Sequence, residues 1–118
     1  MVAEDVNTVI KKLKEDLQAH ACALVSRDGL VLSAEVPNGV YTETFAIMCA
    51  TILGAAATAN TELSRAPPDQ IVVEGPDSKT LIVGSGKKAL LVAVVNHDAD
   101  TQSDLKALAK VAEMVKTA

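Results

Sequence analysis

The chain has 118 residues and a net charge of −4, and hydrophobic residues make up 49% of it. This length predicts one domain, residues 1–118, which buries enough surface to fold without disulfides or a structural metal. Only Tyr41 and Phe45 are aromatic, so the core must consist of Ala, Val, Leu and Ile. The charges are mixed and form no long basic tract, which argues against nucleic acid as the main partner.

The N-terminal segment predicts an amphipathic helix from Val2 to Ala19, because apolar residues recur there at helical spacing and charged residues fill the other positions. Its charges distinguish it from a signal peptide. No run approaches the roughly 18 apolar residues of a membrane span. We therefore expect a cytoplasmic protein without membrane insertion, in which Cys22 and Cys49 are buried and reduced.

A β-hairpin is predicted after this helix. Strands from Ala21 to Ser26 and from Leu30 to Glu35 flank the dipeptide Asp28-Gly29. Glycine tolerates the positive φ that a tight hairpin turn requires, so this dipeptide favours such a turn. Pro37-Asn38-Gly39 is expected to end the second strand.

A long helix is predicted from Tyr41 to Ser64, because this segment contains no Pro and a single Gly, Gly54. Pro67-Pro68 cannot continue a helix. Apolar strands are expected at Gln70 to Glu74, Thr80 to Gly84 and Ala89 to Val95, followed by a last helix from Thr101 to Lys116.

The element order α-β-β-α-β-β-β-α favours an α+β fold around one antiparallel sheet, whose two faces the three helices cover. The strand from Ala89 to Val95 is apolar on both faces, so we expect it in the centre of the sheet. The strand from Gln70 to Glu74 is short and bounded by polar residues, which is typical of a sheet edge.

The long helix is apolar in almost every direction. At about 100° per residue, one face carries Phe45, Cys49, Ile52, Ala56, Ala59 and Leu63, and we expect it to pack on the sheet. A second face carries Ala46, Ala50, Gly54, Ala57 and Thr61, and a third carries Ile47, Thr51, Ala55 and Thr58. A small protein has too little surface to cover all three, so the second and third faces predict an interface with a second copy. Gly54 allows close helix approach, and Gly54→Leu is expected to weaken that dimer.

No segment carries the spacing of a catalytic or metal site. Gly84-Ser85-Gly86-Lys87-Lys88 lacks the first Gly and the final Ser or Thr of a phosphate loop, which leaves a hairpin turn as the interpretation. No zinc-binding spacing is present among His20, Cys22, His97, Asp98 and Asp100. The serines lack a nucleophile motif. We therefore predict a protein that is not an enzyme and binds no metal or cofactor.

The sequence resembles the Roadblock/LC7 family. The resemblance lies in ALVSRDGLVLSAEV, in the long small-residue helix after it and in TLIVGSGKKALLVAVV, and it covers essentially the whole chain. It implies a profilin-like/roadblock fold, in which a five-stranded antiparallel sheet carries the long helix on one face and the terminal helices on the other. It also implies a dimer that pairs middle helices and third strands, which adds Gln70, Ile71, Val72, Val73 and Glu74 to the predicted interface.

The resemblance further implies a homodimeric regulator or scaffold of a Ras-like small GTPase. MglB-like members stimulate GTP hydrolysis without an arginine finger, so neither Arg27 nor Arg65 is nominated for that role. Two alternatives stay open. One is a structural dimerisation subunit of a larger complex, of the dynein light chain type, whose partners are other roadblock-type subunits. The other is a small-molecule sensor domain, which requires a closed apolar pocket with convergent polar groups.

Overall fold

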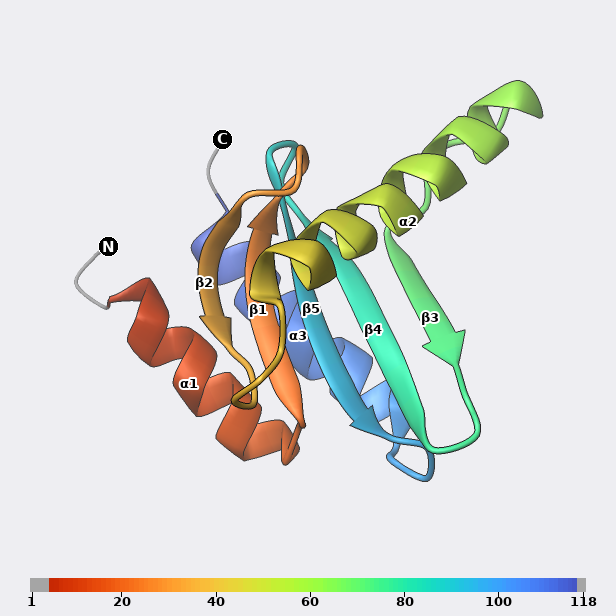
Figure 1. The fold of residues 1–118 in the computed structure, drawn as a ribbon. Helices are drawn as coiled ribbons and strands as arrows, with labels where there is room; N and C mark the ends of the chain where they lie inside the picture. The colour runs from red at the N-terminus through yellow and green to blue at the C-terminus, as the bar shows by residue number, and fades with distance from the viewer. Residues whose placement is uncertain (1–4, 117–118) are drawn as a thin grey trace.

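The computed structural model describes residues 5–116 (Figure 1). The elements are α1 (Val6–Leu17), β1 (Ala21–Ser26), β2 (Val31–Glu35), α2 (Thr42–Glu62), β3 (Gln70–Glu74), β4 (Ser78–Ser85), β5 (Ala89–Asn96) and α3 (Thr101–Val115). The predicted order α-β-β-α-β-β-β-α is confirmed. The predicted start of the first helix at Val2 lies outside the described residues.

The five strands form one antiparallel sheet in the order β2-β1-β5-β4-β3. The central position of β5 and the edge position of β3 are both confirmed. The apolar sequence of β5 explains its central position. The strand buries Leu90 and Val92 on one face of the sheet and Leu91 and Ala93 on the other. A strand that is apolar on both faces is stable only when both faces are covered.

Helices cover both faces, as Figure 1 shows. Ile10 and Leu13 of α1 and Leu105 and Leu108 of α3 pack on one face, in a cluster that includes Leu91. The opposite face packs against α2, in a second cluster that includes Val92. The predicted layering is therefore confirmed. Two helices cover one face of the sheet, and one helix covers the other face.

The orientation of α2 about its own axis differs from the prediction. The residues that α2 buries are Ala46, Cys49, Ala50 and Leu53. Of the face expected on the sheet, Cys49 is buried and Phe45 and Ile52 pack partly against the core, whereas its last member, Leu63, is 74% exposed. Placing Ala46 and Ala50 on a separate outward face was wrong, because both lie in the core between α2 and the sheet. The helix is almost equally apolar in every direction, so its sequence does not specify which side meets the sheet.

Only the first part of α2 lies over its own sheet. The helix crosses the strands diagonally, and its C-terminal end runs past β4 and β3 (Figure 1). None of residues 54–62 is buried. By length and composition, α2 is the one helix within residues 5–116 that could cross a membrane, with a mean hydropathy of 1.3 and 17% of the tested window buried. An exposed apolar surface of this kind on a small domain is typical of an interaction site.

Cys22 and Cys49 are buried and free, as predicted. Cys22 belongs to the cluster beneath α1 and α3, and Cys49 belongs to the cluster beneath α2. The sheet therefore separates the two thiols. Burial raises the pKa of Cys22 to about 12, although Lys14 opposes the shift, and burial raises the pKa of Cys49 to about 11.

Neighbouring substitutions in α2 test its orientation. Leu53→Ala should lower the free energy of unfolding by about 3 kcal/mol, because it leaves a cavity in the core. Gly54→Ala should raise the free energy of unfolding by about 1 kcal/mol, because alanine is the better helix former and no atom lies within 4 Å of an added Cβ. Urea unfolding at one fixed protein concentration measures both. Equal effects of the two changes contradict the observed orientation.

The buried thiols predict a loss of stability at alkaline pH. Unfolded cysteines ionise near their ordinary pKa of 9.0, whereas the folded pKa values are about 12 and about 11. Above pH 9 the unfolded state therefore releases protons that the folded state retains, and the free energy of unfolding falls. Unfolding curves from pH 8 to 10.5 measure this change. The Cys22→Ala/Cys49→Ala variant should show a shallower decline, and an identical decline contradicts the assignment.

Candidate interaction surfaces

Two flanks of α2 border its buried face, and Phe45 and Ile52 in the second of them are half-buried. One, here called the tip flank, comprises Ile47, Thr51, Gly54, Thr58 and Thr61, and the other, here called the open flank, comprises Phe45, Ile52, Ala56, Ala59 and Leu63. Ile47 locates the tip flank, because a Cβ added at Gly29 would lie 2.9 Å from its Cγ1 atom. Gly29 lies in the turn between β1 and β2 with a φ of 96°. The tip flank therefore faces the tips of the hairpins.

The open flank faces the part of the sheet that α2 leaves uncovered. Phe45 lines a hollow of about 210 Å³ with Ala21 and Val94, at the end of the sheet opposite the hairpin tips. Ile71 of β3 pairs with Ile82, which belongs to the cluster beneath α2. Because side chains alternate along a strand, Val73 lies on the same face, and it is 42% exposed. An apolar helix flank and an apolar strand thus border one uncovered area.

The two edges of the sheet differ. β3 pairs with β4 through five consecutive residue pairs without a register shift. β2 is irregular, because its pairing with β1 shifts between Leu24 and Val25 and leaves Leu32 without a partner. A bulge twists an edge away from further pairing, whereas a regular edge exposes backbone groups that a further strand can bond. β3 is therefore the edge suited to extension by another strand.

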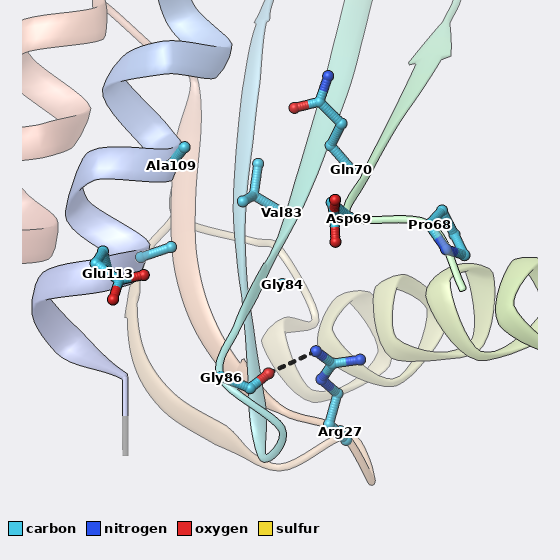
Figure 2. Close-up of a pocket in the computed structure, with 10 residues that line it drawn as sticks. Arg27, Pro68, Asp69, Gln70, Val83, Gly84, Gly86, Ala109 and Glu113 are labelled. Atoms are coloured by element: carbon cyan, nitrogen blue, oxygen red, sulfur yellow. Dashed lines mark hydrogen bonds between the residues drawn. The ribbon is translucent and has the colours of Figure 1, made fainter. Parts of the chain in front are cut away.

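Arg27 holds the tips of the two hairpins together. Its Nε atom donates to the carbonyl oxygen of Ala89 at 2.9 Å, and its Nη2 atom donates to the carbonyl oxygen of Gly86 at 2.7 Å. Figure 2 shows the contact with Gly86. A Cβ at Gly84 would lie 2.9 Å from Nη2, so the glycine leaves room for the guanidinium group. This role of Arg27 was not predicted from the sequence, although a glycine inside a strand often signals close approach by another group.

Arg27 also borders a groove of about 320 Å³ that Glu113 of α3 and Asp69 line from other sides (Figure 2). The described residues of this groove provide no nucleophile beside a base. Ser85, which lies between the groove residues Gly84 and Gly86 in the chain, is buried, and its hydroxyl donates to the carbonyl oxygen of Ala112 at 2.8 Å. Gly86, Lys87 and Lys88 form the β4–β5 hairpin turn, whereas Gly84 and Ser85 of the predicted turn segment are the last residues of β4.

The histidines lie at the end of the sheet opposite the tips. The Nε2 atom of His20 is 2.9 Å from Oδ1 of Asn96, and the backbone N–H of His97 donates to Asp77. Cys22 is fully buried and separate from them. No group of three or more His, Cys, Asp or Glu residues within 5–116 is arranged to hold a metal ion.

Asp100 has a structural position at the start of α3. Its carboxylate accepts a hydrogen bond from the backbone N–H of Ser103 at 3.2 Å and caps the helix. Nearby, Lys79 donates to the hydroxyl of Thr101 at 2.6 Å. Burial, with a further contribution from Asp100, raises the pKa of Asp104, and Lys79 opposes that shift. These charges stabilise a helix end and form no reactive pair.

Comparisons with known proteins agree with this architecture. An uncharacterized protein of Methanocaldococcus jannaschii is 29% identical over 92 residues, which are 78% of each chain. A Roadblock/LC7 domain from Streptomyces avermitilis superposes with a TM-score of 0.87 at 18% identity, over 95% of both chains. Myxococcus xanthus MglB superposes with a TM-score of 0.77 at 18% identity, over 93% of this chain and 96% of that one. The Roadblock/LC7 domain family itself matches residues 5–96, and the chain belongs to this family.

Proposed function

We propose that this protein is a non-enzymatic, cytoplasmic homodimer that regulates or scaffolds a Ras-like small GTPase. The observation that carries the proposal is the uncovered area between the open flank of α2 and β3, beside a regular sheet edge. Membership of the Roadblock/LC7 family and structural similarity to MglB support the regulatory role. Another MglB structure, 22% identical to this chain with a TM-score of 0.78, has a tetrameric arrangement, which favours self-association in proteins of this fold.

The dimer that fits this surface pairs β3 with β3 of a second copy around a two-fold axis. Two antiparallel edges then join into one continuous sheet. In that arrangement the end of α2 that runs past its own β3 lies over the sheet of the partner. Ile52, Ala56 and Leu63 of the open flank meet apolar surface there, as does Val73 of each copy.

This arrangement changes part of the predicted interface. The strand residues Gln70 to Glu74 keep their role. The helix contacts move from the tip flank, which carries Gly54, to the open flank, because only the open flank borders the uncovered sheet. Ala46 and Ala50 are already used within the core.

The regulatory mechanism we propose is selection among GTPase conformations. A regulator shifts such an equilibrium only by as much as its affinities for the two states differ. Within residues 5–116, the guanidinium of Arg27 is held on the carbonyl oxygens of Ala89 and Gly86 and is not free to enter a nucleotide site. We assign no catalytic role to Arg65. We therefore propose that binding energy acts by reshaping the GTPase.

A charge on the open flank tests the dimer. Ala56→Glu should weaken self-association at least about tenfold, because an unpaired carboxylate loses its hydration when the interface closes. Gly54→Leu is the control on the tip flank, where no atom lies within 4 Å of an added Cβ. Sedimentation equilibrium measures both dissociation constants. If Gly54→Leu dissociates the dimer and Ala56→Glu does not, the helices pair through the tip flank instead.

Nucleotide preference tests the regulatory role. The Ras-like GTPases of the source organism, loaded with GDP or with a non-hydrolysable GTP analogue, are titrated into the protein by calorimetry. The GTP form of one of them should bind at least about tenfold more tightly. Arg65→Ala should leave any acceleration of GTP hydrolysis intact. Equal affinity for both forms rejects nucleotide sensing, and absence of binding favours the role of a dimerisation subunit.

A further inference from the structure

We propose that the tip flank of α2 and the two hairpin tips beside it form a docking surface for an acidic, apolar segment of a partner protein. This surface is distinct from the area assigned to the dimer, because the tip flank and the open flank lie on opposite sides of α2. It goes beyond the proposed GTPase regulation and does not require the partner to be a GTPase.

The apolar part of the surface comes from Ile47. Its side chain is 47% exposed, although it is large and hydrophobic. Ile47 lies close to Gly29 of the β1–β2 turn, where an added Cβ would come within 2.9 Å of its Cγ1 atom. Ile47 is therefore held in place before any partner arrives, which lowers the entropy cost of binding.

The cationic part comes from Arg27, Lys87 and Lys88, which with Ser26 and Asp28 line an open depression between the hairpin tips. Gly84 follows Ile82 by two positions in β4, and Ile82 belongs to the cluster beneath α2, so a Cβ at Gly84 would point to the α2 side of the sheet. The guanidinium of Arg27 lies on this side, because its Nη2 atom is 2.9 Å from that Cβ position. Lys88 is next to Arg27 across the turn, where the backbone N–H of Arg27 donates to its carbonyl oxygen at 2.9 Å.

The two lysines are the free cations of this depression, because no salt bridge within residues 5–116 involves Lys87 or Lys88. Arg27 adds positive charge but is already bound to the carbonyl oxygens of Ala89 and Gly86, and Asp69 and Glu113 line the groove on its other side. Asp28 is the one acid lining the depression, and it accepts a hydrogen bond from the Ser26 hydroxyl. The chain as a whole carries a net charge of −4, so this local excess of positive charge is an exception. A partner with carboxylates complements it.

The combination favours a protein segment over other anions. An apolar centre with a charged rim is the usual anatomy of a protein–protein interface. Nucleic acid recognition adds aromatic stacking platforms and more cations, and the surface has three cations and no aromatic residue among those named. Rim charges of this kind mainly raise the association rate and select the partner.

The test uses the full-length protein and a library of short random peptides displayed on phage. Peptides enriched on the protein should combine apolar residues with Asp or Glu. Lys87→Glu/Lys88→Glu should weaken their binding at least about tenfold and lower the association rate. Ile47→Glu should weaken binding as well, because it puts a carboxylate at the apolar part of the surface. Lys11→Glu/Lys106→Glu is the matched control, because it changes the net charge equally at exposed positions of α1 and α3. This control should bind the peptides like the parent.

Three results overturn the proposal. The first is that no peptide is enriched, and the second is that the enriched peptides lack acidic residues. The third is that the tip variant and the control variant lose affinity equally, which makes net charge the cause. Binding of phosphatidylserine vesicles that Lys87→Glu/Lys88→Glu abolishes, without any peptide enrichment, assigns the surface to a membrane instead. Self-association is measured on the same samples, so that a loss of peptide binding can be distinguished from a loss of the proposed dimer.

Discussion

The incomplete overlap between α2 and the sheet governs the rest of this structure. Two helices cover one face of the sheet, but a single helix crosses the other face at an angle. Four residues of α2 are buried in the core, Phe45 and Ile52 pack partly against it, and the C-terminal half of this apolar helix stays outside it. A contiguous exposed apolar patch on a small domain is typical of an interaction site. The same geometry that completes the monomer core thus supports the proposal of a partner.

The diagonal path of α2 also separates its surroundings into two regions of different chemistry. On one side lie the uncovered strands, with apolar residues such as Val73. On the other side lie the hairpin tips, which Arg27 fastens through the carbonyls of Ala89 and Gly86. A dimer through the first region leaves the second exposed on each copy. One helix can therefore serve two interfaces without conflict between them.

The sequence was sufficient to predict the elements and their layers. β1 and β3 begin and end at the predicted residues, because their apolar runs are bounded by turn residues and polar side chains. The rotation of α2 was not predictable, since alanine and threonine give its faces nearly the same apolarity. The Arg27–Gly86 contact joins residues 59 positions apart, and no local pattern records such a contact. The role of the open flank was not predicted for a related reason. The uncovered area of the sheet beside this flank depends on the angle at which α2 crosses the strands.

The unburied end of α2 has a consequence for how the protein behaves on dilution. Residues 54–62 gain little from the core of their own chain, so in the proposed dimer their helical order would depend on packing that the second copy supplies. Assembly that stabilises only the folded state makes apparent stability rise with protein concentration. On dilution of such a dimer, the segment from Leu63 to Pro68, just beyond this end, would be the place where a protease gains access first. Resistance to proteolysis would then increase with protein concentration.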